Sequence, residues 1–259
     1  MKDANANRTA KVVWITGASQ GIGRALALEM ASRGWQVAAS ARNQNLLQTL
    51  EQEAIPLSGS IKGFVLDVCD AMACAKTQAE IEQHWGPIQR LVLNAGTHIP
   101  TPIDDLQLKD FEQLWQINVL GTLKPLLAAL PTMRQHRQGK IAIVASLSGY
   151  RGLPTAAGYG ASKAALINLA ESLHLDLHPS GIQVQLINPG FVKTPLTDRN
   201  PFPMPFLISA EEAAKAIANG LDSTKFEIRF PTRFGLIMGF LKLLPYAPYF
   251  WLVKRFTGI

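Results

Sequence analysis

Short apolar runs alternate with helical patterns along most of the chain. The apolar runs lie at residues 11–16, 35–41, 61–68, 90–96, 140–146 and 182–190. Helical patterns separate them, and the longest two span residues 107–135 and 158–178. Continuous apolar strands that alternate with helices indicate a parallel sheet covered by helices on both faces. Because no internal repeat or linker divides the chain, the pattern predicts a single doubly wound α/β domain.

The last part of the chain has a different character. The run FEIRF at residues 226–230 predicts a final strand at the edge of the sheet. An aromatic and basic tail follows, with prolines among its apolar residues. We therefore expect a main domain of residues 1–230 and a C-terminal extension of that domain at residues 231–259.

Composition supports a globular protein with a large core. The chain has 259 residues, of which 47% are hydrophobic and 17% charged, and this balance argues against disorder. Its two cysteines, Cys69 and Cys74, have no metal-binding or redox spacing, so we expect free thiols in a reducing compartment. The polar N-terminus lacks the apolar core of a signal peptide. These features predict a cytoplasmic protein without a bound metal.

The net charge of +6 is concentrated near the C-terminus. Residues 225–259 contain six basic residues against Glu227 alone, and nine of the chain's 20 aromatic residues. A nucleic-acid-binding face would need a recognition motif as well as basic charge, and the sequence contains none. We therefore expect no nucleic-acid partner.

A glycine-rich turn follows the first predicted strand. In a doubly wound sheet, ligands bind outside the carboxyl ends of the strands. The turn reads TGASQGIG from Thr16 to Gly23, and glycines there would let a pyrophosphate approach the backbone at a helix N-terminus. The candidate cofactor residues in this turn are Gly17, Ser19, Gln20, Gly21, Ile22 and Gly23.

The end of the second strand favours one form of the cofactor. A dinucleotide with a free ribose 2′-hydroxyl would call for Asp or Glu at this place, whereas the chain has Ala41, Arg42 and Asn43. With no carboxylate to repel a phosphate, and with Arg42 available to bind one, the sequence predicts NADP(H) over NAD(H). The alternative is that Arg42 is an ordinary solvated residue at a helix start.

Two further strand ends carry candidate cofactor contacts. Asp67 and Val68 follow the third strand, where the carboxylate could accept a hydrogen bond from an adenine amino group. Asn94, Ala95 and Gly96 follow the fourth strand and are small enough for close approach of the backbone to a ligand. Either segment could instead be a capping turn.

A tyrosine and a lysine are spaced four residues apart in YGASK, at Tyr159 and Lys163. Positions i and i+4 share one face of a helix, so the phenol and the ammonium would lie together. A nearby cation lowers a phenol pKa that starts near ~10, which would make the phenol a usable proton donor at neutral pH. Taken alone, a pair with this spacing is in most cases an ordinary feature of a helix surface.

Taken together, these motifs resemble the short-chain dehydrogenase/reductase family. Ser146 ends the fifth strand, 13 residues before Tyr159, and Asn118 lies 28 residues before Ser146 in a predicted helix. The resemblance rests on TGASQGIG, the NAG after the fourth strand, Asn118, Ser146, YGASK, and Pro189-Gly190 followed by Val192-Lys193-Thr194. It covers about residues 10–220 and implies a Rossmann-type fold.

The resemblance implies a role for each of these residues. Tyr159 would be the general acid in carbonyl reduction and the general base in alcohol oxidation. Lys163 would lower the tyrosine pKa and bind the nicotinamide ribose, and both residues would contact the cofactor. Ser146 would orient the substrate oxygen beside Tyr159, while the backbone carbonyl of Asn118 would hold a water that relays protons to Lys163. The residues that would close over the nicotinamide are Pro189, Gly190, Val192 and Thr194.

The implied activity is NADPH-dependent hydride transfer to the carbonyl of a small hydrophobic substrate. The apolar segment Asn200–Phe206 corresponds to a substrate lid in the family, and Tyr150, Arg151 and Leu153 could line the same pocket. The alternatives are an oxidative alcohol or hydroxysteroid dehydrogenase and, in a different class, a dinucleotide-binding sensor without turnover. The family also implies a homodimer or homotetramer.

The C-terminal tail departs from the family pattern. Residues 234–253 are mostly apolar, but Lys242, Pro245 and Pro248 make them a poor spanning helix. Three roles remain open for the tail. It could make peripheral contact with a membrane, cover the substrate pocket of its own or a neighbouring subunit, or pack at an oligomer interface.

Overall fold

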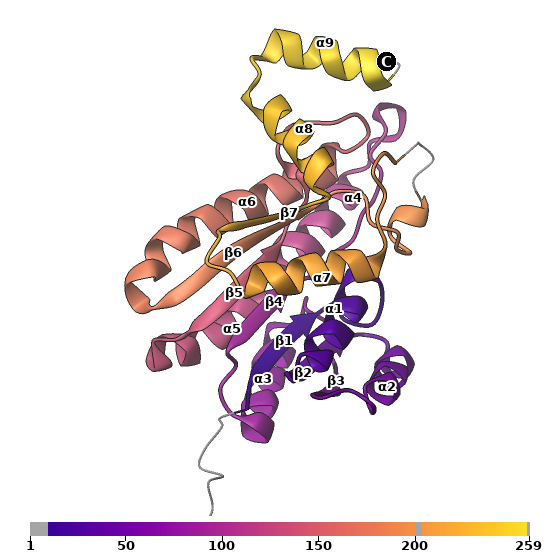
Figure 1. The fold of residues 1–259 in the computed structure, drawn as a ribbon. Helices are drawn as coiled ribbons and strands as arrows, with labels where there is room; N and C mark the ends of the chain where they lie inside the picture. Colours follow the sequence, from indigo (N-terminus) through magenta and orange to yellow (C-terminus); the bar gives the residue numbers. More distant parts are fainter. Residues whose placement is uncertain (1–9, 200–203, 258–259) are drawn as a thin grey trace, which may run out of the picture.

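A seven-stranded parallel sheet forms the centre of the computed structural model, which describes residues 10–199 and 204–257. The strand order is β3-β2-β1-β4-β5-β6-β7 (Figure 1). The strands are β1 (Val12–Thr16), β2 (Gln36–Ala41), β3 (Ser60–Val65), β4 (Arg90–Leu93), β5 (Gly139–Val144), β6 (Ile182–Pro189) and β7 (Glu227–Phe230). All six pairings between neighbours are parallel, which confirms the predicted fold class. The strand predicted from FEIRF is β7, and it lies at the sheet edge as expected.

Helices cover both faces of the sheet (Figure 1). They are α1 (Gly21–Ser32), α2 (Gln44–Glu53), α3 (Ala71–Trp85), α4 (Leu108–Leu114), α5 (Gly121–His136), α6 (Ala157–Leu177), α7 (Ala210–Leu221), α8 (Thr232–Leu243) and α9 (Tyr246–Thr257). One core contains buried residues of α1, α2 and α7, and the other contains buried residues of α3, α5 and α6. Along β1, Val13 and Ile15 enter the first core while Trp14 enters the second, because successive side chains of a strand point to opposite faces.

The long helix predicted at 107–135 contains an irregularity that the sequence pattern did not show. Between α4 and α5, residues Trp115–Leu120 form a π-helical segment, in which Gly121 N–H donates to the carbonyl of Gln116. Each π-turn holds an extra residue, and such segments are frequent at functional sites. Asn118 lies within this segment.

The C-terminal extension consists of α8 and α9, which follow β7. Both helices lie beyond the carboxyl end of the sheet, and α9 is at the extremity of the molecule (Figure 1). Over residues 10–199 and 204–257, no helix combines the length and the apolar content that crossing a bilayer would require.

Candidate active site

A cavity of about 590 Å³ opens at the carboxyl ends of the strands. Its volume lies within the range of small-molecule and cofactor sites. Of the residues predicted to act in catalysis or to bind the cofactor, Asn118 alone is absent from the cavity lining. The predicted residues that do line it are Gly17, Ser19, Gln20, Gly21, Ile22, Gly23, Arg42, Asp67, Val68, Asn94, Ala95, Gly96, Ser146, Tyr159, Lys163, Pro189, Gly190, Val192 and Thr194.

The glycine-rich turn after β1 has a backbone that requires glycine. Gly17 and Gly21 have φ values of +67° and +57°, which side chains with a Cβ rarely adopt. A Cβ at Gly17 would lie 2.8 Å from the Cα of Ala95, and a Cβ at Gly23 would overlap the carbonyl oxygen of Gly17. The turn therefore has no space for a Cβ at Gly17 or Gly23. At its end α1 begins at Gly21, and the side chain of its N-cap residue, Gln20, makes no capping hydrogen bond to the first-turn N–H groups.

Asn94 and Thr16 hold this turn in place. The side-chain amide of Asn94 donates to the carbonyls of Thr16 (3.0 Å) and Gly17 (3.1 Å). In return, the Thr16 hydroxyl oxygen accepts from the backbone N–H groups of Asn94 (3.0 Å) and Ala95 (3.1 Å). These four bonds join the turn after β1 to the segment after β4. The sequence predicted a ligand-facing or capping role for Asn94 but did not identify Thr16 as its partner.

Arg42 lies at the rim of the cavity on the loop after β2. Its side chain is exposed, and over the described residues it makes no hydrogen bond or ion pair with the protein. The next residue, Asn43, caps α2 by accepting from the Leu46 N–H at 3.1 Å. On the neighbouring strand end, Asp67 accepts from the Cys69 N–H at 2.9 Å through one carboxylate oxygen. Arg42 is thus free to bind an anionic group in the cavity.

Tyr159 and Lys163 lie on one face of α6, as their spacing predicted. The Lys163 Nζ is 5.7 Å from the centre of the Tyr159 ring and donates to the Val144 carbonyl at 3.0 Å. Opposite them, the Ser146 hydroxyl oxygen accepts from the Ser148 N–H at 3.1 Å. The segment after β5 and the first turns of α6 therefore bring a hydroxyl, a phenol and an ammonium to one end of the cavity.

Burial shifts the pKa values of Tyr159 and Lys163. It raises the pKa of the Tyr159 phenol, and the hydrogen bond with Ser146 acts in the opposite direction. It also lowers the pKa of the Lys163 ammonium to about 8. The lowered tyrosine pKa expected from the sequence was therefore wrong in direction, because loss of solvation at the phenol outweighs the favourable contacts.

Asn118 lies one layer behind the cavity wall. Its side chain is fully buried; the amide donates to the Thr97 carbonyl (3.0 Å) and the Ser162 hydroxyl (2.9 Å), and Oδ1 accepts from the Thr97 N–H (2.7 Å). The Asn118 carbonyl accepts from the Thr122 hydroxyl at 2.7 Å. The asparagine therefore joins the π-helical segment to α6 and to the loop after β4.

The cavity also has lining residues that sequence reasoning missed. They are Ala41, Asn43, Leu46, Leu66, Cys69, Thr97, Gln113, Gln116, Ile117, Val144, Ala145, Pro195, Leu196 and Thr197. Those adjacent to predicted strand ends, such as Leu66 and Thr97, could have been found by extending each segment. Gln113, Gln116 and Ile117 come from α4 and the π-helical segment, and no local pattern marks which face of that helix meets the cavity. The ring of His98 also lies edge-on against the ring of Tyr159, with centroids 4.7 Å apart.

Replacing Lys163 by methionine is expected to change how stability depends on pH. Since the pKa falls from 10.5 to about 8 on folding, the unfolded chain binds the extra proton between these two values. Wild-type stability should therefore rise with pH across this window relative to Lys163→Met, by about 3 kcal/mol in all, and the difference should be constant below pH 8.

Urea unfolding of both proteins at a series of pH values would measure this difference. Lys215→Met makes the same change at an exposed position on α7 and is the matched control. If the stability of wild type and Lys163→Met changed with pH in parallel across this window, the pKa of Lys163 would not be lowered on folding.

Comparisons with known proteins agree with this geometry. A family model described as short chain dehydrogenase matches residues 11–201. An uncharacterised oxidoreductase from Myxococcus xanthus is 36% identical over 240 residues, covering 93% of this chain and 95% of the relative. A short-chain dehydrogenase from Sphingobium yanoikuyae, solved in complex with NADPH, has a TM-score of 0.78 at 25% identity, over 91% of this chain and 97% of that chain. A short chain dehydrogenase/reductase from Burkholderia phymatum in complex with NAD has a TM-score of 0.81 at 22% identity, over 88% and 92% of the two chains, which shows the fold alone.

Proposed function

The chain belongs to the short-chain dehydrogenase/reductase family, and we propose that it is an NADPH-dependent reductase of hydrophobic carbonyl compounds. One observation carries the proposal. A single cavity is lined at one end by the glycine-rich turn and Arg42, and at the other by Ser146, Tyr159 and Lys163. The first set suits the phosphates of a dinucleotide, and the second suits proton transfer to an oxygen.

The residues around the turn fit a dinucleotide. The places that a Cβ would fill at Gly17 and Gly23 are occupied by neighbouring backbone and by Asn94, so the backbone itself forms the wall of the cavity there. Backbone N–H groups at the start of α1 would bind the pyrophosphate. Bound NADPH would supply the hydride, and the protein would supply position and electrostatics.

Proton transfer is assigned to the residues at the other end of the cavity. The Ser146 hydroxyl would hydrogen-bond the substrate oxygen and hold it beside Tyr159. Because its pKa is raised, the Tyr159 phenol keeps its proton at neutral pH and can donate it to an oxygen that gains negative charge. With a pKa of about 8, Lys163 is largely protonated at neutral pH, so its charge would favour the phenolate that remains. The same residues would serve the reverse oxidation of a secondary alcohol.

The preference for NADPH rests on the loop after β2. Arg42 lines the cavity at its rim and has no ion-pair partner within residues 10–199 and 204–257, and neither of its neighbours, Ala41 and Asn43, carries a carboxylate. The relative from Sphingobium yanoikuyae was solved with NADPH, whereas the Burkholderia phymatum protein was solved with NAD. Since these two structures hold different cofactors, the choice between NADPH and NADH rests on the charge around Arg42. That charge favours the 2′-phosphate of NADPH.

Arg42→Ala is expected to weaken NADPH binding by about 10- to 100-fold and to leave NADH binding nearly unchanged, because only NADPH has the phosphate that the guanidinium would bind. Fluorescence titration with both cofactors would measure the two affinities. Arg134→Ala removes an exposed arginine from the last turn of α5 and should change neither. If wild type binds NADH more tightly than NADPH, the assignment of Arg42 is wrong.

A hydrophobic substrate is favoured by the aromatic residues beside the cavity. The ring of Phe234 stacks on Phe191, with centroids 5.4 Å apart, and on Phe206 at 6.0 Å. Phe191 directly follows Gly190, which lines the cavity. Asn200, Pro201, Phe202 and Pro203 of the expected lid lie outside the described residues. Tyr150, Arg151 and Leu153 are not among the cavity-lining residues.

We also propose that two or four copies associate through α5 and α6. Leu127 on α5 and Leu175 on α6 have 62% and 73% of their surface exposed, and such a contact would cover them. Sedimentation velocity of the full chain would measure the assembly, and a monomer would exclude it.

A further inference from the structure

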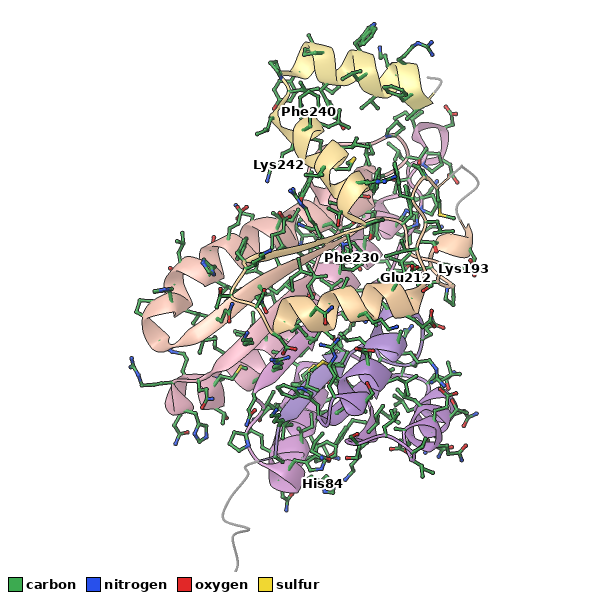
Figure 2. The ribbon with its side chains drawn as sticks, viewed as in Figure 1. His84, Lys193, Glu212, Phe230, Phe240 and Lys242 are labelled. Atoms are coloured by element: carbon green, nitrogen blue, oxygen red, sulfur yellow. The ribbon has the colours of Figure 1, made fainter. Side chains whose placement is uncertain are left out.

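The C-terminal helix pair, α8 and α9 with residues 244–245 between them, carries a dense group of exposed apolar side chains. Eight large hydrophobic residues there are between 46% and 82% exposed. They are Leu236, Ile237, Phe240, Leu243, Tyr246, Phe250, Trp251 and Phe256. The pair lies at the extremity of the molecule in Figure 1, and Figure 2 shows Phe240 and Lys242 near the junction of its helices. Apolar patches of this kind mark protein or membrane contacts.

The helix pair is held to the domain by specific contacts. The Arg151 guanidinium donates to the carbonyls of Lys242 (3.2 Å) and Leu244 (2.9 Å) and lies 4.2 Å above the Tyr249 ring. The Tyr249 hydroxyl donates to the Gly152 carbonyl at 2.6 Å, and its side chain is buried. Because these anchors face inward, they orient the opposite, apolar faces of both helices toward solvent.

The charge of the helix pair favours an anionic lipid surface over a second copy of the chain as its partner. Between residues 232 and 257 there are four basic residues and no Asp or Glu. The basic residues are Arg233, Lys242, Lys254 and Arg255. A second copy docking on the same face would bring like charges together, whereas an anionic lipid surface would neutralise them. Tryptophan, tyrosine and phenylalanine beside lysine and arginine also suit the interface between headgroups and acyl chains.

We propose that the C-terminal helix pair docks the protein on the surface of an anionic lipid bilayer. The exposed aromatic and aliphatic side chains enter the headgroup boundary, and Lys254 and Arg255 contact lipid phosphates. Neither helix spans the bilayer, since α8 and α9 each have 12 residues and a spanning helix needs about 20. This docking does not depend on the cofactor or the reaction assigned above.

Vesicle flotation of the full chain tests the proposal with two lipid compositions, phosphatidylcholine alone and phosphatidylcholine mixed with phosphatidylglycerol. We expect binding to the mixed vesicles and weaker binding at high salt. Phe250→Ser combined with Trp251→Ser should reduce partitioning at least about tenfold. Lys254→Gln combined with Arg255→Gln should reduce binding to the mixed vesicles about thirtyfold, with a much smaller effect on phosphatidylcholine alone.

Matched controls distinguish binding through this face from non-specific adsorption of the protein to vesicles. Ile55→Ser with Met72→Ser removes two side chains that are at least 80% exposed elsewhere on the domain, and Lys76→Gln with Lys215→Gln removes two exposed charges. Neither control should alter flotation. All substituted positions are exposed, so circular dichroism should show the wild-type fold.

Three results would overturn the proposal. The first is failure of wild type to float with the mixed vesicles, and the second is equal flotation of wild type and both helix-pair variants. The third is a reduced assembly size for Phe250→Ser/Trp251→Ser in sedimentation velocity with unchanged flotation, which would assign this face to a second copy of the chain.

Discussion

Tyr159→Phe is expected to slow NADPH-dependent reduction of a hydrophobic ketone by about 10²- to 10⁴-fold while NADPH affinity stays unchanged. The substitution removes one oxygen from a side chain at the cavity end that also contains Ser146 and Lys163. The ring remains and can keep its contact with His98. Loss of rate without loss of binding would therefore identify the phenol as the proton donor.

The measurement pairs a steady-state assay of NADPH consumption with fluorescence titration of NADPH. Tyr246→Phe, which removes the same atom from an exposed tyrosine on α9, should match wild type in both. Wild-type activity in Tyr159→Phe would contradict the assigned role. If wild type binds NADPH but turns over no carbonyl and no alcohol, the protein is a dinucleotide sensor and not an enzyme.

Gly23→Ala is expected to weaken NADPH binding about 100-fold or more and to lower the free energy of unfolding by about 1–3 kcal/mol. The added methyl group would overlap the Gly17 carbonyl and lie 2.5 Å from the Asn94 amide nitrogen. Either the turn or the asparagine has to move, so the backbone N–H groups at the start of α1 would lose their alignment toward the pyrophosphate.

Isothermal titration with NADPH and urea unfolding would measure the two effects of Gly23→Ala. Gly152→Ala is the matched control, because a Cβ at Gly152 would have no heavy atom within 4 Å. It should bind and unfold like wild type. If Gly23→Ala bound NADPH with wild-type affinity, the cofactor phosphates would not be held by this turn.

Much of the fold could be predicted because apolar periodicity reports burial directly. Each apolar run became a parallel strand, and the last strand along the chain, β7, lies at the predicted edge of the sheet. The π-helical segment could not be predicted, because an extra residue within a helical turn leaves little trace in the spacing of apolar residues. Asn118 itself was the one local signal, since asparagine is a poor helix former.

The candidate site was predictable wherever it follows a strand, because parallel strands bring their carboxyl ends to one edge. Contacts between segments far apart in sequence, such as those of Thr16 with Asn94, need the tertiary structure. The direction in which the pKa of Tyr159 shifts also needs the tertiary structure. Spacing places Lys163 beside the phenol, but the loss of solvation that reverses the direction of the shift depends on everything packed around it.

The four hydrogen bonds between Thr16 and the segment at Asn94 have a consequence for how cofactor binding is driven. They fix the conformation of the turn that we propose binds the pyrophosphate, by bonds that the folded protein makes within itself. The conformational entropy of ordering the turn is therefore lost when the chain folds, and little remains to be lost when a dinucleotide arrives. In this sense the turn would be preorganised for a phosphate, by hydrogen bonds at the junction of β1 and β4.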